Sequence, residues 1–161
     1  MRQHYEKESD REAARREMEK YVSHTGADFD EVQPWLDKII SHDFVVIDRG
    51  TKQITEYTEV KVRRESAGDI IKFGGTVILE QVKMMQAMLL TKTNPHACAA
   101  FLVVLGGDQY VIRYRYSQMP DIDRVEWFTR RDRPNESSPV VHIPLESFIR
   151  VDMPETAVMV S

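Results

Sequence analysis

The apolar positions of the chain follow a helical spacing near the amino terminus and a strand-like spacing soon after it. A helix is predicted over residues 9–22, because one face would collect four apolar side chains: Ala14, Met18, Tyr21 and Val22. Ser9 and Glu12 have the spacing of a capping box, which gives Glu12 a structural role. Thr25-Gly26 ends the helix. Residues 28–42 give a weaker pattern, in which Pro34 would start a helical turn. One side of that turn would be buried by four apolar residues: Trp35, Leu36, Ile39 and Ile40.

A β-hairpin is predicted between residues 44 and 63. Residues 44–47 form a short apolar run, residues 49–52 have turn composition, and residues 54–63 alternate in polarity. Successive side chains of a strand point to opposite faces. One face of the second strand is therefore apolar, and we expect the other to be exposed and to carry four polar or charged residues: Tyr57, Glu59, Lys61 and Arg63.

A second helix and a second pair of strands follow. The helix is predicted over residues 79–91, with a core stripe at Val82, Met85, Met88 and Leu89. Residues 97–105 are almost wholly apolar, which is typical of a strand buried on both faces. Residues 106–108 form a tight turn, and residues 110–116 are the returning strand.

The last part of the chain, residues 117–161, is richer in proline and arginine, and we expect it to wrap the edge of the sheet. It is predicted to contain a strand, a turn of helix and a loose tail: residues 140–143, 145–149 and 153–161. The order of elements predicts an α/β fold with a mixed central β-sheet flanked by helices. We expect a single domain over residues 1–161, with its core within residues 5–150.

Composition is that of a soluble globular protein. The 161 residues, 42% of them hydrophobic, are enough for one core. No apolar run approaches the ~20 residues of a membrane span, and the charged amino terminus lacks the apolar middle of a signal peptide. Cys98 is the single cysteine and cannot form an internal disulfide, so we expect a reducing cytoplasm.

The net charge and the positions of the basic residues limit how the protein could bind nucleic acid. The net charge of −4 argues against a protein that coats DNA, since such proteins are usually basic, but allows an enzyme that meets DNA along a local groove. Basic residues gather in three short segments, at residues 61–64, 113–115 and 130–133. Each segment is either a nucleic-acid contact or a solvated surface.

Two carboxylates and a lysine are predicted to meet on the hairpin. Asp43 opens the first strand, and Glu59 and Lys61 share a face of the second while Val60 turns away. Magnesium takes hard oxygen ligands, usually one or two carboxylates with waters and a substrate phosphate. Asp43, Glu59 and the carbonyl of Val60 would supply such ligands, and Lys61 would polarise a water or stabilise phosphate charge. We expect the three side chains to converge at one edge of the sheet, with Val60 buried behind them; otherwise the triplet is a surface ion pair.

The pattern Asp43 … Glu59-Val60-Lys61, with a helix before and a helix after, resembles the PD-(D/E)XK nuclease superfamily, whose fold is the restriction-endonuclease-like fold. The resemblance extends from Tyr5 to about Phe148 and looks like that of a small, stand-alone, phage-type member. Residues 76–81 are similar to the segment that leads into the family's second helix, where a lysine or glutamine often faces the site; Gln81 occupies that place. His42 stands where the family has its nominal proline, which leaves Asp48 as an alternative to Asp43.

The resemblance implies a metal-dependent nuclease, using Mg²⁺ or Mn²⁺, that hydrolyses DNA in phage DNA processing, recombination or defence. It implies a cytoplasmic location in the bacterial host and a homodimer among the partners. The family often carries a glutamate on its first helix, which is Glu17 here, with Glu12 as the alternative. The implied catalytic residues are Asp43, Glu59, Lys61, Glu17 and Gln81, and the expected nucleic-acid contacts are Arg63, Arg64, Arg113 and Arg115.

Two other functions remain open from the sequence. A catalytically inactive protein of this fold that binds nucleic acid or a partner protein fits the negative net charge, and an RNA-directed nuclease fits the same residues. A zinc site is not expected, because the histidines do not have metal-ligand spacing with Cys98. A nucleophilic role for Cys98 is not expected either, because its surroundings are apolar.

Overall fold

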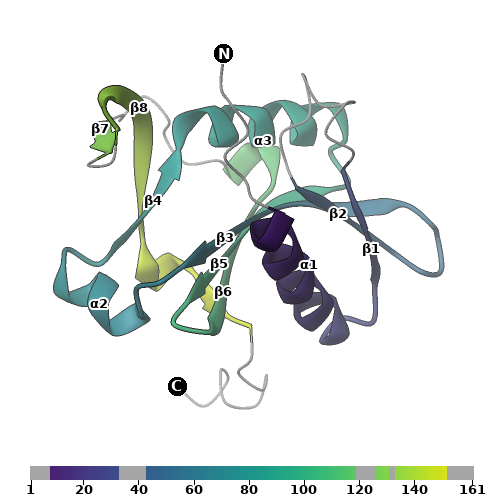
Figure 1. Ribbon diagram of the computed structural model, residues 1–161. Helices are drawn as coiled ribbons and strands as arrows, with labels where there is room; N and C mark the ends of the chain where they lie inside the picture. The colour runs from purple at the N-terminus through teal and green to yellow at the C-terminus, as the bar shows by residue number, and fades with distance from the viewer. Residues whose placement is uncertain (1–7, 33–42, 119–125, 131–132, 152–161) are drawn as a thin grey trace.

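A computed structural model of the chain describes residues 8–32, 43–118, 126–130 and 133–151 (Figure 1). Its main element is a six-stranded sheet, in which β3 and β5 run parallel and every other neighbouring pair is antiparallel. In spatial order the strands are β1 (Asp28–Glu31), β2 (Phe44–Ile47), β3 (Ile54–Arg63), β5 (Cys98–Leu105), β6 (Asp108–Tyr114) and β9 (Ile149–Arg150).

Parallel strands need a long crossover connection, and here it supplies one of the two helical layers. Between β3 and β5 the chain forms α2 (Ala67–Lys72), β4 (Thr76–Glu80) and α3 (Gln81–Thr93). The amino-terminal helix α1 (Glu8–Ser23) covers the opposite face of the sheet (Figure 1). The sheet is therefore enclosed between α1 and α3.

The two faces of the sheet carry separate cores, which explains why β5 is apolar along its whole length. Alternate residues of β5 pack either with Met84 and Ala87 of α3 or with Met18 and Tyr21 of α1. Strands buried on both faces read as continuous apolar runs rather than alternating ones. The prediction for residues 97–105 is confirmed.

A second, three-stranded antiparallel sheet lies beside the first, in the order β4–β8–β7 (Figure 1). It joins β4 of the crossover to β7 (Glu126–Arg130) and β8 (Arg133–Pro144). Short 3₁₀ turns follow β6 at Tyr116–Gln118 and β8 at Leu145–Ser147. The described residues of the carboxyl-terminal part thus mainly build this sheet, and only β9 among them lies on the edge of the main one.

The predicted α/β class, with a mixed sheet flanked by helices, is confirmed, as are the first helix and the hairpin. Residues 28–31 are a strand, and the predicted turn from Pro34 lies outside the described residues, as does the tail from residue 153. The predicted strand at residues 140–143 is part of the longer β8.

The core stripe predicted for the second helix is wrong. Val82, Met85 and Leu89 are exposed, and α3 instead buries Met84, Ala87 and Thr91. Apolar residues occur on both sides of this helix, so their spacing does not identify the side that packs.

Candidate active site

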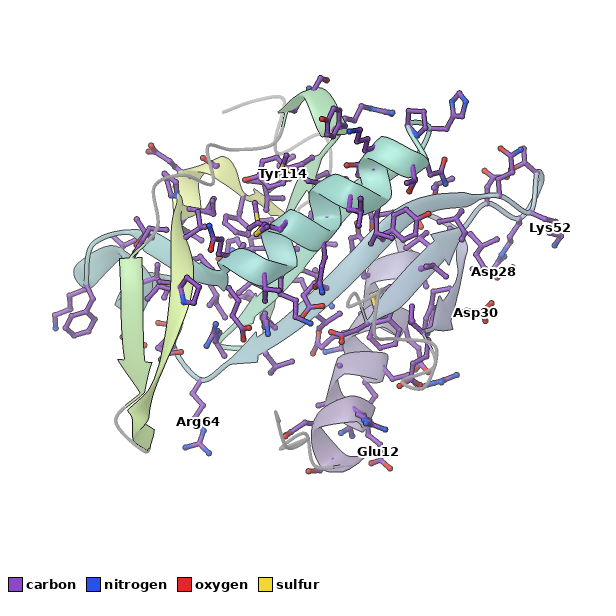
Figure 2. All side chains as sticks on the ribbon, turned by 90° about the horizontal axis from the view of Figure 1, so that it is seen from above. Glu12, Asp28, Asp30, Lys52, Arg64 and Tyr114 are labelled. Atoms are coloured by element: carbon purple, nitrogen blue, oxygen red, sulfur yellow. The ribbon has the colours of Figure 1, made fainter. Side chains whose placement is uncertain are left out.

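The faces of β3 separate Val60 from its two charged neighbours as predicted. Val60 packs in the core beneath α1, with Met18 and Tyr21. Glu59 points the other way, toward α3, and pairs in register with Phe101 of β5. The sequence predicts that this face of β3 is exposed. In the structure it is covered instead, because α3 lies across it (Figure 2).

Asp43 reaches the same stretch of β3 from the residue before β2. The β2–β3 ladder ends where Phe44 pairs with Thr58, and beyond it the N–H of Val60 donates to Oδ2 of Asp43 at 3.2 Å. The N–H and C=O of one strand residue point to the same side, so the carbonyl of Val60 also faces Asp43. The contacts of Asp43 with Val60 and of Lys61 with Glu59 lie inside the sheet and not at its outer edge, because β3 is the third of six strands. The convergence of Asp43 with Glu59 and Lys61 stays a prediction.

Glu59 is the most deeply buried acidic side chain of this arrangement, 2% exposed. Its Oε1 atom lies 3.4 Å from Nζ of Lys61 and 3.4 Å from Nζ of Lys83. Its Oε2 atom is buried and has no hydrogen-bond partner within the described part of the chain. Burial raises the pKa of Glu59, and the two ammonium groups offset this only in part.

Lys83 is a member of the cluster that the sequence argument missed. It lies in the first turn of α3 and its side chain is 18% exposed. The stripe Met84, Ala87 and Thr91 identifies the side of the helix that packs, and Lys83 flanks that stripe. Gln81, the predicted residue, is half-buried at the first position of α3, two residues earlier.

Glu17 is not brought to this cluster. Nε2 of Gln109 donates to Oε2 of Glu17 at 2.6 Å and to its backbone oxygen at 2.8 Å, and Lys20 lies 3.3 Å from Oε1. Glu17 therefore sits between α1 and β6, on the opposite face of the sheet from Glu59. The alternative, Glu12, is exposed and points away from the sheet (Figure 2).

Three of the predicted nucleic-acid contacts lie on the surface, and the fourth, Arg113, is partly exposed and joins a network around a buried glutamate. Arg64 projects into solvent beyond the end of β3 (Figure 2), and Arg63 is exposed while donating to the carbonyl of Ile78 at 3.2 Å. Arg115 is exposed. Arg113 instead donates from Nε to Oε1 of Glu56 at 2.8 Å and from Nη2 to the hydroxyl of Tyr21 at 2.6 Å.

That network is centred on Glu56, a buried glutamate of β3 on the α1 face. The hydroxyl of Tyr21 donates to the carboxylate, 2.9 and 2.8 Å from its two oxygens, and Thr58 donates to Oε2 at 2.8 Å. Burial and the nearby Glu56 charge raise the pKa of Tyr21. Burial and the same charge raise the pKa of Cys98 to about 11, which disfavours its nucleophilic thiolate form at neutral pH.

The residues around Glu59 suit a hard divalent cation, although they are few. No three acidic, histidine or cysteine side chains gather closely enough for a metal site in the described ranges. Magnesium, however, commonly uses only one or two carboxylates. A buried carboxylate oxygen without a donor is costly and is satisfied by a cation, so Oε2 of Glu59 fits such an ion.

Comparison with known proteins identifies the family. No curated protein matches this chain. Separately, no helix among the described residues is both long and apolar enough to cross a membrane. The family described as "Phage putative PDDEXK endonuclease" matches residues 1–151, which takes in the whole main sheet, both helical layers and every residue of the Glu59 cluster. The chain belongs to this phage PD-(D/E)XK endonuclease family.

Proposed function

We propose that the protein is a Mg²⁺- or Mn²⁺-dependent nuclease that hydrolyses phosphodiester bonds of DNA. Asp43, Glu59 and the carbonyl of Val60 would hold the cation. When bound, the cation would neutralise phosphate charge and lower the pKa of a coordinated water. The single observation that carries the proposal is Oε2 of Glu59, a buried carboxylate oxygen with no donor in the described structure.

Lys61 is assigned to the attacking water or the scissile phosphate. It extends from the same face of β3 as Glu59, and its side chain is 25% exposed, so its ammonium group is accessible to a substrate while remaining partly desolvated. Partial desolvation strengthens its interaction with a developing negative charge. Asp43 keeps a second function, since its bond to the N–H of Val60 fixes the backbone between Glu59 and Lys61.

Phosphate contacts are assigned to Arg63 and Arg64, which follow Lys61 directly along the chain and are exposed. A DNA strand that reaches Lys61 would then continue along the end of β3. Arg113 is left out of this set, because its guanidinium already donates hydrogen bonds to Glu56 and Tyr21.

The test is cleavage by the purified chain of supercoiled, linear and branched DNA, and of RNA, with Mg²⁺ or Mn²⁺. Glu59→Ala and Lys61→Ala should lose activity, whereas Glu65→Ala, which removes an exposed carboxylate just after β3, should not. Cleavage that persists in the first two variants would reject the site. Absence of both cleavage and calorimetric metal binding would favour a binding protein of the same fold.

A further inference from the structure

Two buried oxygens lack a hydrogen-bond partner in the described part of the chain, one on β3 and the other on α3. One is Oε2 of Glu59, and the other is Oε1 of Gln86. Buried polar atoms are nearly always paired, so each exception requires an explanation. Gln109 shows the ordinary case, because its buried amide donates twice to Glu17.

The position of α3 places Gln86 on the side of the helix that faces Glu59. The helix is attached to β3 at both ends: Lys83 pairs with Glu59, and Nδ2 of Asn94 donates to the hydroxyl of Tyr57 at 3.3 Å. Tyr57 and Glu59 share one face of β3. Helical residues three or four apart are neighbours on one side, and the series Lys83, Gln86, Leu90 and Asn94 follows that spacing.

Gln86 therefore lies one turn beyond Lys83, between the two points where α3 is attached to β3. The exposed stripe of Val82, Met85 and Leu89 occupies the side turned away from the sheet. The uncharged amide of Gln86 cannot form an ion pair with Glu59, and its oxygen can only accept a hydrogen bond.

The chemistry of the missing partner follows from the two orphan atoms. Both are hard oxygen acceptors, so their partner must be a cation or a hydrogen-bond donor. Magnesium keeps several of its waters when it binds a protein, and water molecules that coordinate a cation through oxygen present hydrogen atoms outward. A hydrated divalent cation thus offers a positive centre for one oxygen and a donor for the other.

We propose that Gln86 is a positioning residue of the cation site, whose side-chain oxygen accepts a hydrogen bond from the hydration shell of the ion that Asp43 and Glu59 hold. This inference rests on the proposed function. It explains both orphan oxygens with one ligand, and it adds to the site a residue that is neither acidic nor part of the Glu59-Val60-Lys61 stretch.

The test compares Gln86→Leu and Gln86→Glu with the wild-type chain by Mn²⁺ calorimetry and by thermal unfolding in EDTA. Gln86→Leu keeps similar bulk but removes the acceptor, so Mn²⁺ binding should weaken on the order of tenfold. Its Tm in EDTA should stay equal or rise, because an unsatisfied buried oxygen has been removed. Gln86→Glu keeps an acceptor and should bind Mn²⁺ at least as tightly as wild type. Met88→Leu, on the other flank of α3, is the matched control.

Two results would overturn the inference while leaving the proposed function in place: unchanged Mn²⁺ affinity in Gln86→Leu, or a Tm in EDTA several degrees below wild type, which would mark Gln86 as structural. If wild type bound no Mn²⁺ and cleaved no DNA, the proposed function would fail, and this inference with it. Weaker binding together with unchanged or higher Tm is a combination that a structural role would not produce.

Discussion

Glu56 and Glu59 are two buried glutamates three residues apart on the same strand, and they differ in how many of their carboxylate oxygens have a hydrogen-bond or ion-pair partner. Glu56, 6% exposed on the α1 face, receives donors from Tyr21, Thr58 and Arg113 on both of its oxygens. Glu59, 2% exposed on the α3 face, has both of its lysines on one oxygen and no donor on the other within the described residues.

The difference distinguishes a carboxylate that holds the fold together from one that is available for a ligand. The partners of Glu56 come from α1, from β3 itself and from β6, so the carboxylate links three elements around the sheet. Glu59 is linked to α3 and to its own strand, and burial still raises its pKa. Burial is common to both glutamates, and the incomplete set of partners is what supports the proposed site at Glu59.

The largest effect is expected for Glu59→Gln. The amide is nearly isosteric but removes the anionic oxygen, so cleavage should fall on the order of a thousandfold or more. The unfolding free energy should fall less than in Glu56→Gln: Lys61 and Lys83 lose their carboxylate, but a buried charge that they offset only in part is replaced by a neutral group. Parallel measurements of single-turnover cleavage and urea unfolding check both. A variant that lost stability but kept its cleavage rate per folded molecule would place Glu59 in the same class as Glu56.

Glu56→Gln should show the reverse pattern. Removing the charge leaves Arg113 without its carboxylate, and we expect a loss of about 2 kcal/mol, below the usual value for a broken buried pair because Arg113 is 40% exposed. Cleavage per folded molecule should stay near wild type at a temperature where the variant is folded. Urea unfolding and activity normalised to folded protein are the measurements. A large loss of activity in a fully folded variant would contradict the contrast.

Strand geometry is the reason that much of the cluster could be predicted. Glu59 and Lys61 share a face because side chains alternate, whatever the rest of the fold does. Asp43 reaches Val60 through a hairpin, which is a local connection. Two partners of Glu56, Tyr21 on α1 and Arg113 on β6, by contrast lie 35 and 57 residues away, and no local pattern indicates which helix crosses which strand.

The packing faces of the helices are harder to predict from the sequence than the faces of the strands. α3 has apolar residues on both sides, so their periodicity predicts the wrong buried stripe. It therefore gives no sign that Lys83 and Gln86 lie on the side toward the sheet. On α1 the spacing predicts the buried residues Met18 and Tyr21, but it does not predict which face of the sheet they cover. Because α1 covers the face opposite Glu59, Glu17 lies beside Gln109 rather than beside Glu59. Packing partners between distant elements depend on the whole topology, which the spacing of residues does not encode.

The two lysines on Glu59 allow the contrast to be sharpened. Lys61→Met should lower cleavage about a hundredfold, as expected for a group that acts on the water or phosphate. Lys83→Met should lower it about tenfold, because Lys83 mainly fixes the carboxylate. Since both ammonium groups contact the same oxygen, the double variant should lose less than the product of the two. Single-turnover rates for the four proteins test this, and independent, multiplicative effects would show that the lysines do not act through Glu59.

The last prediction concerns Cys98, whose Sγ lies 3.7 Å from Oε1 of Glu56. Burial first, and then the Glu56 charge, raise the pKa of the thiol from 9.0 to about 11. The reactive thiolate is favoured as pH rises, so alkylation by iodoacetamide should increase up to about pH 11 and be on the order of a hundredfold slower at pH 8 than for a thiol of ordinary pKa. Glu56→Gln removes the charge and should lower this pKa, making alkylation at pH 8 faster, whereas Glu59→Gln should leave the rate unchanged because Glu59 lies on the other face. Equal rates in both variants would mean that the charge of Glu56 is already neutralised by Arg113 and Tyr21, and that burial accounts for the shift.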